Sequence, residues 1–226
     1  MTLRNTGGSV RLGMLALPLA GLLALAGLYG ASKLGSGGIL ATGDNQAMVS
    51  TGFFVSVFLG NVLALTVLIF GVMALYAFLA NGRSGALVLA AMILSTFGIS
   101  LMLSRLGVIA YVVPALSRSY LHGNLESIRI LDSVFAGPLV MVDTVSSVSY
   151  SAGFLLFGIA VWRSGILPRW AGVLIAVHAP LITGPFSVAG AVTGALLALV
   201  GGGWIAFSSL QINPGQADSA TILRAR

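Results

Sequence analysis

The chain contains no cysteine and very little charge. Among its 226 residues, 5 are acidic, 11 are lysine or arginine and 2 are histidine. The absence of cysteine excludes disulfides, thiolate metal sites and cysteine nucleophiles. Charged residues make up 7% of the chain, whereas a soluble domain carries roughly 25%. The basic residues are scattered singly rather than gathered in a patch, which argues against nucleic-acid binding.

Long apolar stretches take the place of the missing charge. Hydrophobic residues account for 58% of the chain, and a helix of about 20 of them crosses the roughly 30 Å hydrocarbon core of a bilayer. The first stretch resembles a signal peptide but exceeds the usual apolar region of roughly 7–15 residues, so we interpret it as a retained helix. The sequence predicts an all-α bundle of six transmembrane helices, at about 12–30, 53–79, 86–104, 134–162, 170–188 and 191–207.

Basic residues predict the orientation of this bundle. With the N-terminus inside, seven arginines fall on the cytoplasmic side and four basic residues on the other, as the positive-inside rule requires. Six spans then place both termini in the cytoplasm. We expect one transmembrane domain over residues 1–211, followed by a cytoplasmic tail over 212–226.

The segment between the third and fourth spans predicts a helix outside the membrane. Leu121, Leu125, Ile128 and Leu131 recur at helical spacing opposite polar side chains. This pattern favours a short amphipathic helix lying on the outer leaflet. The apolar run before it, residues 106–117, either extends the third span or re-enters the bilayer, and the sequence leaves both open.

Polar residues inside the apolar spans are the candidate site. Asp143 is the only acid within a span, and on a helix it shares one face with Ser147 and Tyr150. Asn61 in the second span lies at a similar depth, and Arg105 ends the third. Since polar side chains are costly in lipid, we expect these five residues to form a cluster that binds a ligand in the outer half of the bundle.

A structural interpretation of the same residues remains open. If the fourth helix begins at Gly137 and Pro138, Asp143 lies near the interface and pairs with Arg105 or with water. Asn61 alone is typical of a hydrogen bond that packs two helices together.

Other features of the spans point away from cofactor chemistry. His178 lies within the fifth span without a second histidine at ligand spacing, so we expect a hydrogen-bonded core histidine and no haem, metal or other cofactor. The phosphate-binding and nucleophile-elbow motifs are absent, so we predict that the chain is not an enzyme. Gly190 and Gly194 form a GxxxG pair, which favours close helix contact within the bundle or between copies.

One turn resembles a bacterial membrane family. The turn after the fourth span joins two apolar helices, and its matching residues are Trp162, Arg163, Ser164, Gly165, Leu167, Pro168, Arg169, Trp170 and Gly172. It is similar to the turn of the family called "domain of unknown function 4386", as is Thr42-Gly43-Asp44 to that family's first outer loop. The resemblance implies a six-helix protein of a bacterial cytoplasmic (inner) membrane and supplies no functional residues.

Three functions are compatible with the sequence. The first is a non-enzymatic protein that binds a lipid or hydrophobic small molecule among Asn61, Arg105, Asp143, Ser147 and Tyr150. The second is an accessory or scaffold subunit whose glycine-rich helices contact another membrane protein or a second copy. The third is a proton-coupled transporter that uses Asp143.

Overall fold

The part of the chain that the structure describes is entirely helical. The computed structural model describes residues 6–32, 50, 53, 57–80, 84–184 and 188–211. All regular elements there are helices, which confirms the predicted all-α fold. In order they are α1 (Thr6–Gly13), α2 (Ala16–Ser32), the π-helix η2 (Phe58–Leu63), α5 (Ala64–Leu79), α6 (Gly85–Leu121), α7 (Glu126–Ala136), α8 (Pro138–Ser164), α9 (Arg169–Thr183) and α10 (Val188–Gln211).

Most of these helices are long and apolar enough to cross a membrane. Within the described residues there are five such helices, and α9, with 15 residues, is a shorter apolar one. Large apolar side chains cover the outside of the bundle, among them Phe70, Met73, Ile93, Phe97 and Val148. An apolar exterior suits hydrocarbon and not water, which indicates a multi-pass membrane protein.

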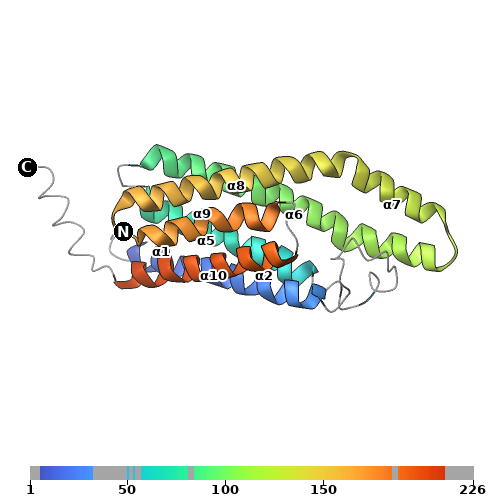
Figure 1. Cartoon of the computed structure of the whole chain (residues 1–226), viewed down its shortest axis with the longest axis horizontal. Coiled ribbons are helices and arrows are strands. Elements are labelled where there is room, and N and C mark those ends of the chain that lie inside the picture. Colours follow the sequence, from blue (N-terminus) through green and yellow to red (C-terminus); the bar gives the residue numbers. More distant parts are fainter. Residues whose placement is uncertain are drawn as a thin grey trace, which may run out of the picture.

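The helices run along one axis and form an elongated bundle (Figure 1). The start of α1 and the end of α10 lie at one end of it, together with the turn between α8 and α9. At the opposite end α6, α7 and the start of α8 extend beyond the other helices. The predicted tail, residues 212–226, lies outside the described residues.

Helix α6 is longer than the predicted third span. It continues past residue 104 to Leu121 and includes Pro114. Residues 106–117 therefore extend the span and do not form a separate re-entrant segment. At 1.5 Å per residue, the 37 residues of α6 measure about 55 Å, well beyond the roughly 30 Å of a hydrocarbon core. The helix continues because this run is apolar throughout and packs along α7 and α8.

The predicted amphipathic helix begins later than the sequence pattern indicated. Leu121 is the last residue of α6, and Leu125 lies in the turn before α7, so the prediction that both belong to that helix was wrong. The turn occurs because Gly123 adopts a φ of 95°, which glycine tolerates and other residues avoid. Helix α7 runs alongside the end of α6 (Figure 1). Its predicted location on the leaflet is not confirmed.

Proline residues explain two of the other shifted helix boundaries. Helix α8 begins at Pro138 instead of near residue 134, because Gly137 leaves the helical conformation and proline suits a first turn. The first predicted span is divided into α1 and α2 at Met14 and Leu15, since Pro18 lacks the N–H that would bond to Met14. Helix α9 ends at Thr183, before the predicted boundary at residue 188.

The turn between α8 and α9 has a compact geometry that its sequence explains. Gly165 ends α8 in the left-handed region, with a φ of 65°. The hydroxyl of Ser164 accepts the backbone N–H groups of Ile166 and Leu167. The rings of Trp162 and Trp170 meet edge to face with centroids 6.0 Å apart.

Glycines allow the central helices to touch through their backbones. A Cβ placed on Gly98 of α6 would lie 2.5 Å from the backbone nitrogen of Tyr150 in α8. The same helices meet again where a Cβ on Gly153 would lie 2.4 Å from the nitrogen of Ser95. Gly194 of the predicted GxxxG pair faces α9 inside the fold, where a Cβ would lie 2.9 Å from the carbonyl oxygen of His178.

Candidate functional site

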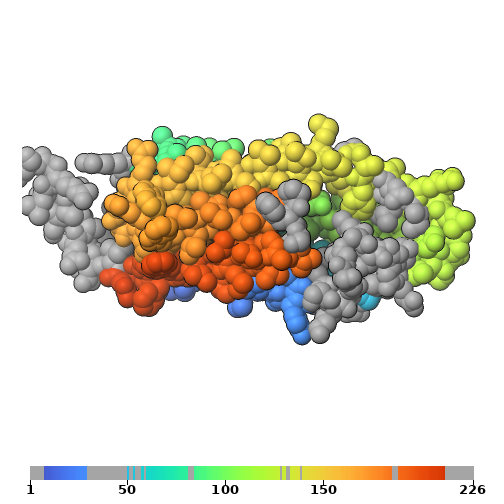
Figure 2. Space-filling view, in the orientation of Figure 1, coloured from blue at the N-terminus to red at the C-terminus, as the bar shows by residue number. Residues whose placement is uncertain are grey.

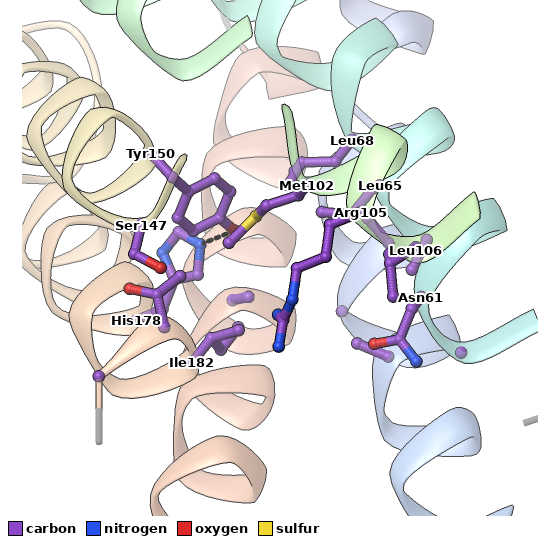
Figure 3. A pocket seen from close by; sticks show the side chains of 18 of the residues that line it. Asn61, Leu65, Leu68, Met102, Arg105, Leu106, Ser147, Tyr150, His178 and Ile182 are labelled. Atoms are coloured by element: carbon purple, nitrogen blue, oxygen red, sulfur yellow. Dashed lines mark hydrogen bonds between the residues drawn. The ribbon is translucent and has the colours of Figure 1, made fainter. Parts of the chain in front are cut away.

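A cavity of about 350 Å³ lies in the middle of the bundle. Side chains from α2, η2, α5, α6, α8, α9 and α10 line it, so it depends on segments far apart in the sequence. Its apolar wall includes Leu65, Leu68, Met102 and Ile182 (Figure 3). In the space-filling view, α8, α9 and α10 lie side by side along the bundle (Figure 2).

All five predicted site residues line this cavity. They are Asn61, Arg105, Asp143, Ser147 and Tyr150. The predicted polar face of α8 is present, because Asp143, Ser147 and Tyr150 are spaced about one helical turn apart. The structure therefore brings the predicted cluster together, while ligand binding by these residues stays a prediction.

Arg105 and Asp143 form an ion pair across α6 and α8. The Nη1 atom of Arg105 lies 2.7 Å from Oδ1 of Asp143, and the two side chains are 29% and 41% exposed. This pairing is the one that the structural interpretation of the sequence anticipated. A guanidinium carries five N–H donors and a carboxylate two acceptor oxygens. Even a pairing through both carboxylate oxygens would therefore leave N–H donors of the guanidinium available to the cavity.

Tyr150 and His178 form a second polar pair on the cavity wall. The Tyr150 hydroxyl lies 3.0 Å from Nε2 of His178, and both side chains are buried. The Nδ1 atom of His178 bonds to the carbonyl oxygen of Ile175 and must therefore donate. Since a neutral imidazole has one N–H, Nε2 is then the acceptor and the tyrosine hydroxyl donates to it. Tyr150 consequently presents only the lone pairs of its oxygen to the cavity.

Two further polar side chains facing the cavity have no intramolecular partner. Among the described residues, neither the carboxamide of Asn61 nor the hydroxyl of Ser147 makes a hydrogen bond. Asn61 lies in η2, and a π-helix within an α-helix is frequently found at functional sites. A close crossing holds η2 against α2, where a Cβ on Gly60 would lie 2.0 Å from the Cα of Gly27.

His178 is the cavity residue that sequence reasoning missed as a site member. The sequence predicted a hydrogen-bonded core histidine, and the bonds to Tyr150 and Ile175 confirm that part. In the sequence of α9, His178 does not belong to a polar helical face. Its position on the cavity wall therefore becomes evident only from the packing of α9 against α8. Both ring nitrogens are engaged, which leaves neither open to a cofactor in this conformation. No three His, Asp or Glu side chains of the described segments gather as metal ligands.

A Tyr150→Phe variant is expected to lose about 1–3 kcal/mol of stability, because the buried Nε2 of His178 would lose its donor. The matched control is Tyr111→Phe in α6, where the side chain is 68% exposed and a change within about 0.5 kcal/mol is expected. The measurement is the unfolding midpoint of each purified variant in the same detergent. Equal midpoints for both variants would show that the hydrogen bond contributes nothing to stability.

No protein-family model, no curated protein and no solved structure matches the chain. The resemblance of the turn at residues 162–172 to the family of unknown function therefore stays a prediction. The candidate site rests on its own geometry.

Proposed function

We propose that this chain is a non-enzymatic membrane protein that binds a lipid or another amphiphilic small molecule in its central cavity. The observation behind the proposal is the set of polar groups without intramolecular partners around that space, Asn61 and Ser147 above all. In a bundle surrounded by hydrocarbon, polar groups without partners are costly unless a ligand or water satisfies them. An apolar wall with a few convergent polar groups is typical of a small-molecule site.

The membrane arrangement belongs to the same proposal. We infer six spans, with α9 as the shortest, measuring about 22 Å for its 15 residues. Both termini then lie on the cytoplasmic side, as the arginine distribution predicts, and the family resemblance implies that the membrane is a bacterial inner membrane. The end of α6 and all of α7 project outside, where Arg118, Glu126 and Arg129 meet water.

The short α9 supports access to the cavity from the outer side. Thr183 and Gly184 at its end line the cavity. A helix of about 22 Å leaves the outer part of a 30 Å core uncovered at this position. An amphiphile in the outer leaflet would therefore reach the polar groups without crossing the bundle.

An Asn61→Leu variant tests this function. Because the Asn61 carboxamide makes no intramolecular hydrogen bond, its replacement by a side chain of similar size removes only contacts to a ligand. Native mass spectrometry of wild-type protein, gently extracted from its own membrane, should show a discrete small-mass adduct. One or two lost hydrogen bonds should weaken retention of this adduct roughly two- to tenfold in the variant.

Gln211→Leu is the matched control, because it replaces an exposed amide at the far end of α10. This variant should retain the adduct to the same extent as the wild type. Co-eluting polypeptides at fixed stoichiometry, with no adduct in the wild-type protein, would contradict the proposal and favour an accessory subunit. An adduct retained equally by wild type and Asn61→Leu would place the ligand elsewhere.

A further inference from the structure

Among the described residues that line the cavity, the charges cancel. The residues lining it include one guanidinium, Arg105, and one carboxylate, Asp143. The other titratable side chains on its wall are Tyr150 and His178, which bond to each other. Helices α2, η2, α5 and α10 contribute no charged side chain to the lining. From the described residues, a ligand in this space therefore meets one positive and one negative group, with Nη1 of Arg105 2.7 Å from Oδ1 of Asp143.

The ion pair leaves both of its members able to bind a second partner. Nη1 of Arg105 and Oδ1 of Asp143 make the contact between the two groups, at 2.7 Å. In the described part of the chain, neither side chain forms an ion pair with any other residue. Figure 3 shows the Arg105 side chain extended into the middle of the cavity, between His178 and Asn61. The guanidinium is therefore placed to contact a head group that binds in the cavity.

Electrostatics then selects among ligands. An anion that pairs with Arg105 would leave the Asp143 carboxylate facing a like charge, and a cation that pairs with Asp143 would oppose Arg105 in the same way. Placing like charges together costs several kcal/mol. A head group that carries both signs compensates both residues and gains charge-assisted hydrogen bonds, which are about twice as strong as neutral ones.

The size of the cavity limits what accompanies the head group. A volume of about 350 Å³ lies at the lower end of ligand pockets, which span roughly 300–1,000 Å³. It accommodates a head group or a small zwitterion, and the apolar wall suits the first methylenes of a chain. Asn61 and Ser147 supply the uncharged donors and acceptors around it.

We propose that the cavity recognises a zwitterionic group, whose anionic part binds Arg105 and whose ammonium binds Asp143. This inference rests on the proposed ligand-binding function and names its ligand class. The group belongs either to a membrane lipid with a phosphoethanolamine head or to a soluble zwitterion, since both present the same two charges. The Arg105–Asp143 contact opens to admit it, and each residue exchanges one charged partner for another.

The test compares head groups that share one acyl chain. Purified protein in mild detergent is incubated with equal concentrations of single-chain lipids bearing a phosphoethanolamine, a phosphoglycerol or an uncharged glycerol head. Native mass spectrometry measures retention of each. We expect the wild type to retain the zwitterionic lipid at least about tenfold over the others, because one unpaired charge costs more than the roughly 1.4 kcal/mol of a tenfold ratio.

Two variants and a control separate charge recognition from general binding. Asp143→Asn should reverse the preference toward the anionic phosphoglycerol lipid, since Arg105 is then unopposed. The double variant Asp143→Asn/Arg105→Gln keeps the cavity neutral without an unpaired charge, and it should show no preference. Glu126→Gln breaks the exposed Arg129–Glu126 pair outside the cavity and should behave like the wild type.

The outcomes distinguish this inference from the proposed function. If the wild type retains the anionic or the uncharged lipid as well as the phosphoethanolamine lipid, or better, the proposal of zwitterion recognition is overturned. The proposal that the cavity binds an amphiphile would then still stand. An unchanged preference in the double variant overturns zwitterion recognition as well. If no lipid is retained by any form and none is found in the native extract, the proposed function fails too. Displacement by soluble glycerophosphoethanolamine, which has the same phosphodiester and ammonium, assigns the zwitterion to a soluble source, and resistance to displacement assigns it to a lipid.

Discussion

A Gly98→Ala variant is expected to lose about 3 kcal/mol of stability or more. The added Cβ would lie 2.5 Å from the backbone nitrogen of Tyr150 and 2.9 Å from the carbonyl oxygen of Ser146. Overpacking a core usually costs about 1–3 kcal/mol because side chains can shift. Here the opposing atoms are backbone, so relief requires that α6 and α8 separate.

The matched control lies on the same helix. A Cβ on Gly107 of α6 would meet nothing within 4 Å. Gly107→Ala should therefore be neutral or stabilising, by up to about 1 kcal/mol from helix propensity. The measurement is the unfolding midpoint in detergent together with the monodisperse fraction after extraction. A Gly98→Ala protein as stable as Gly107→Ala would contradict the close crossing of α6 and α8.

The Gly98 crossing also positions the site. It lies next to Ser146 and Tyr150, and Tyr150 lines the cavity. Separation of α6 from α8 would also lengthen the contact between Arg105 and Asp143, one on each helix. We therefore expect any Gly98→Ala protein that folds to retain less ligand than the wild type.

An Asp143→Asn variant without ligand should be destabilised by about 1–3 kcal/mol. Exposed ion pairs contribute roughly 0.2–1 kcal/mol, and removal of one partner from a fully buried pair costs roughly 3–5 kcal/mol. The Arg105–Asp143 pair lies between these limits, with side chains 29% and 41% exposed. The loss arises because Arg105 keeps its charge inside an apolar bundle without its partner.

The double variant Asp143→Asn/Arg105→Gln should recover most of that stability, since it removes both charges together. The exposed pair Arg129–Glu126, with side chains 82% and 62% exposed, provides the reference. Its Glu126→Gln variant should shift stability by less than about 0.5 kcal/mol. Chemical unfolding of all three proteins in one detergent measures the differences. A double variant less stable than Asp143→Asn would show that the pair stabilises the fold beyond charge compensation.

The predictions from the sequence were most accurate for features that depend on a single local pattern. The scarcity of charge and the long apolar stretches predicted an all-helical membrane bundle, and the spacing of Asp143, Ser147 and Tyr150 predicted one polar face. Boundaries were less accurate because they depend on tertiary packing. Helix α6 passes the predicted end at residue 104 and tolerates Pro114, since α7 and α8 pack along its far end.

The sequence by itself determined the helical class of the protein and predicted five of the residues that line its cavity. Its long apolar stretches indicate a lipid environment, in which a polar side chain within a span needs a partner or a ligand. Only the tertiary structure decided which polar residues meet. Gly98 and Gly153 let α6 and α8 approach closely enough for Arg105 to reach Asp143. The packing of α9 on α8 adds His178 to the cavity, because a contact between residues 28 positions apart follows from helix packing and from no local pattern.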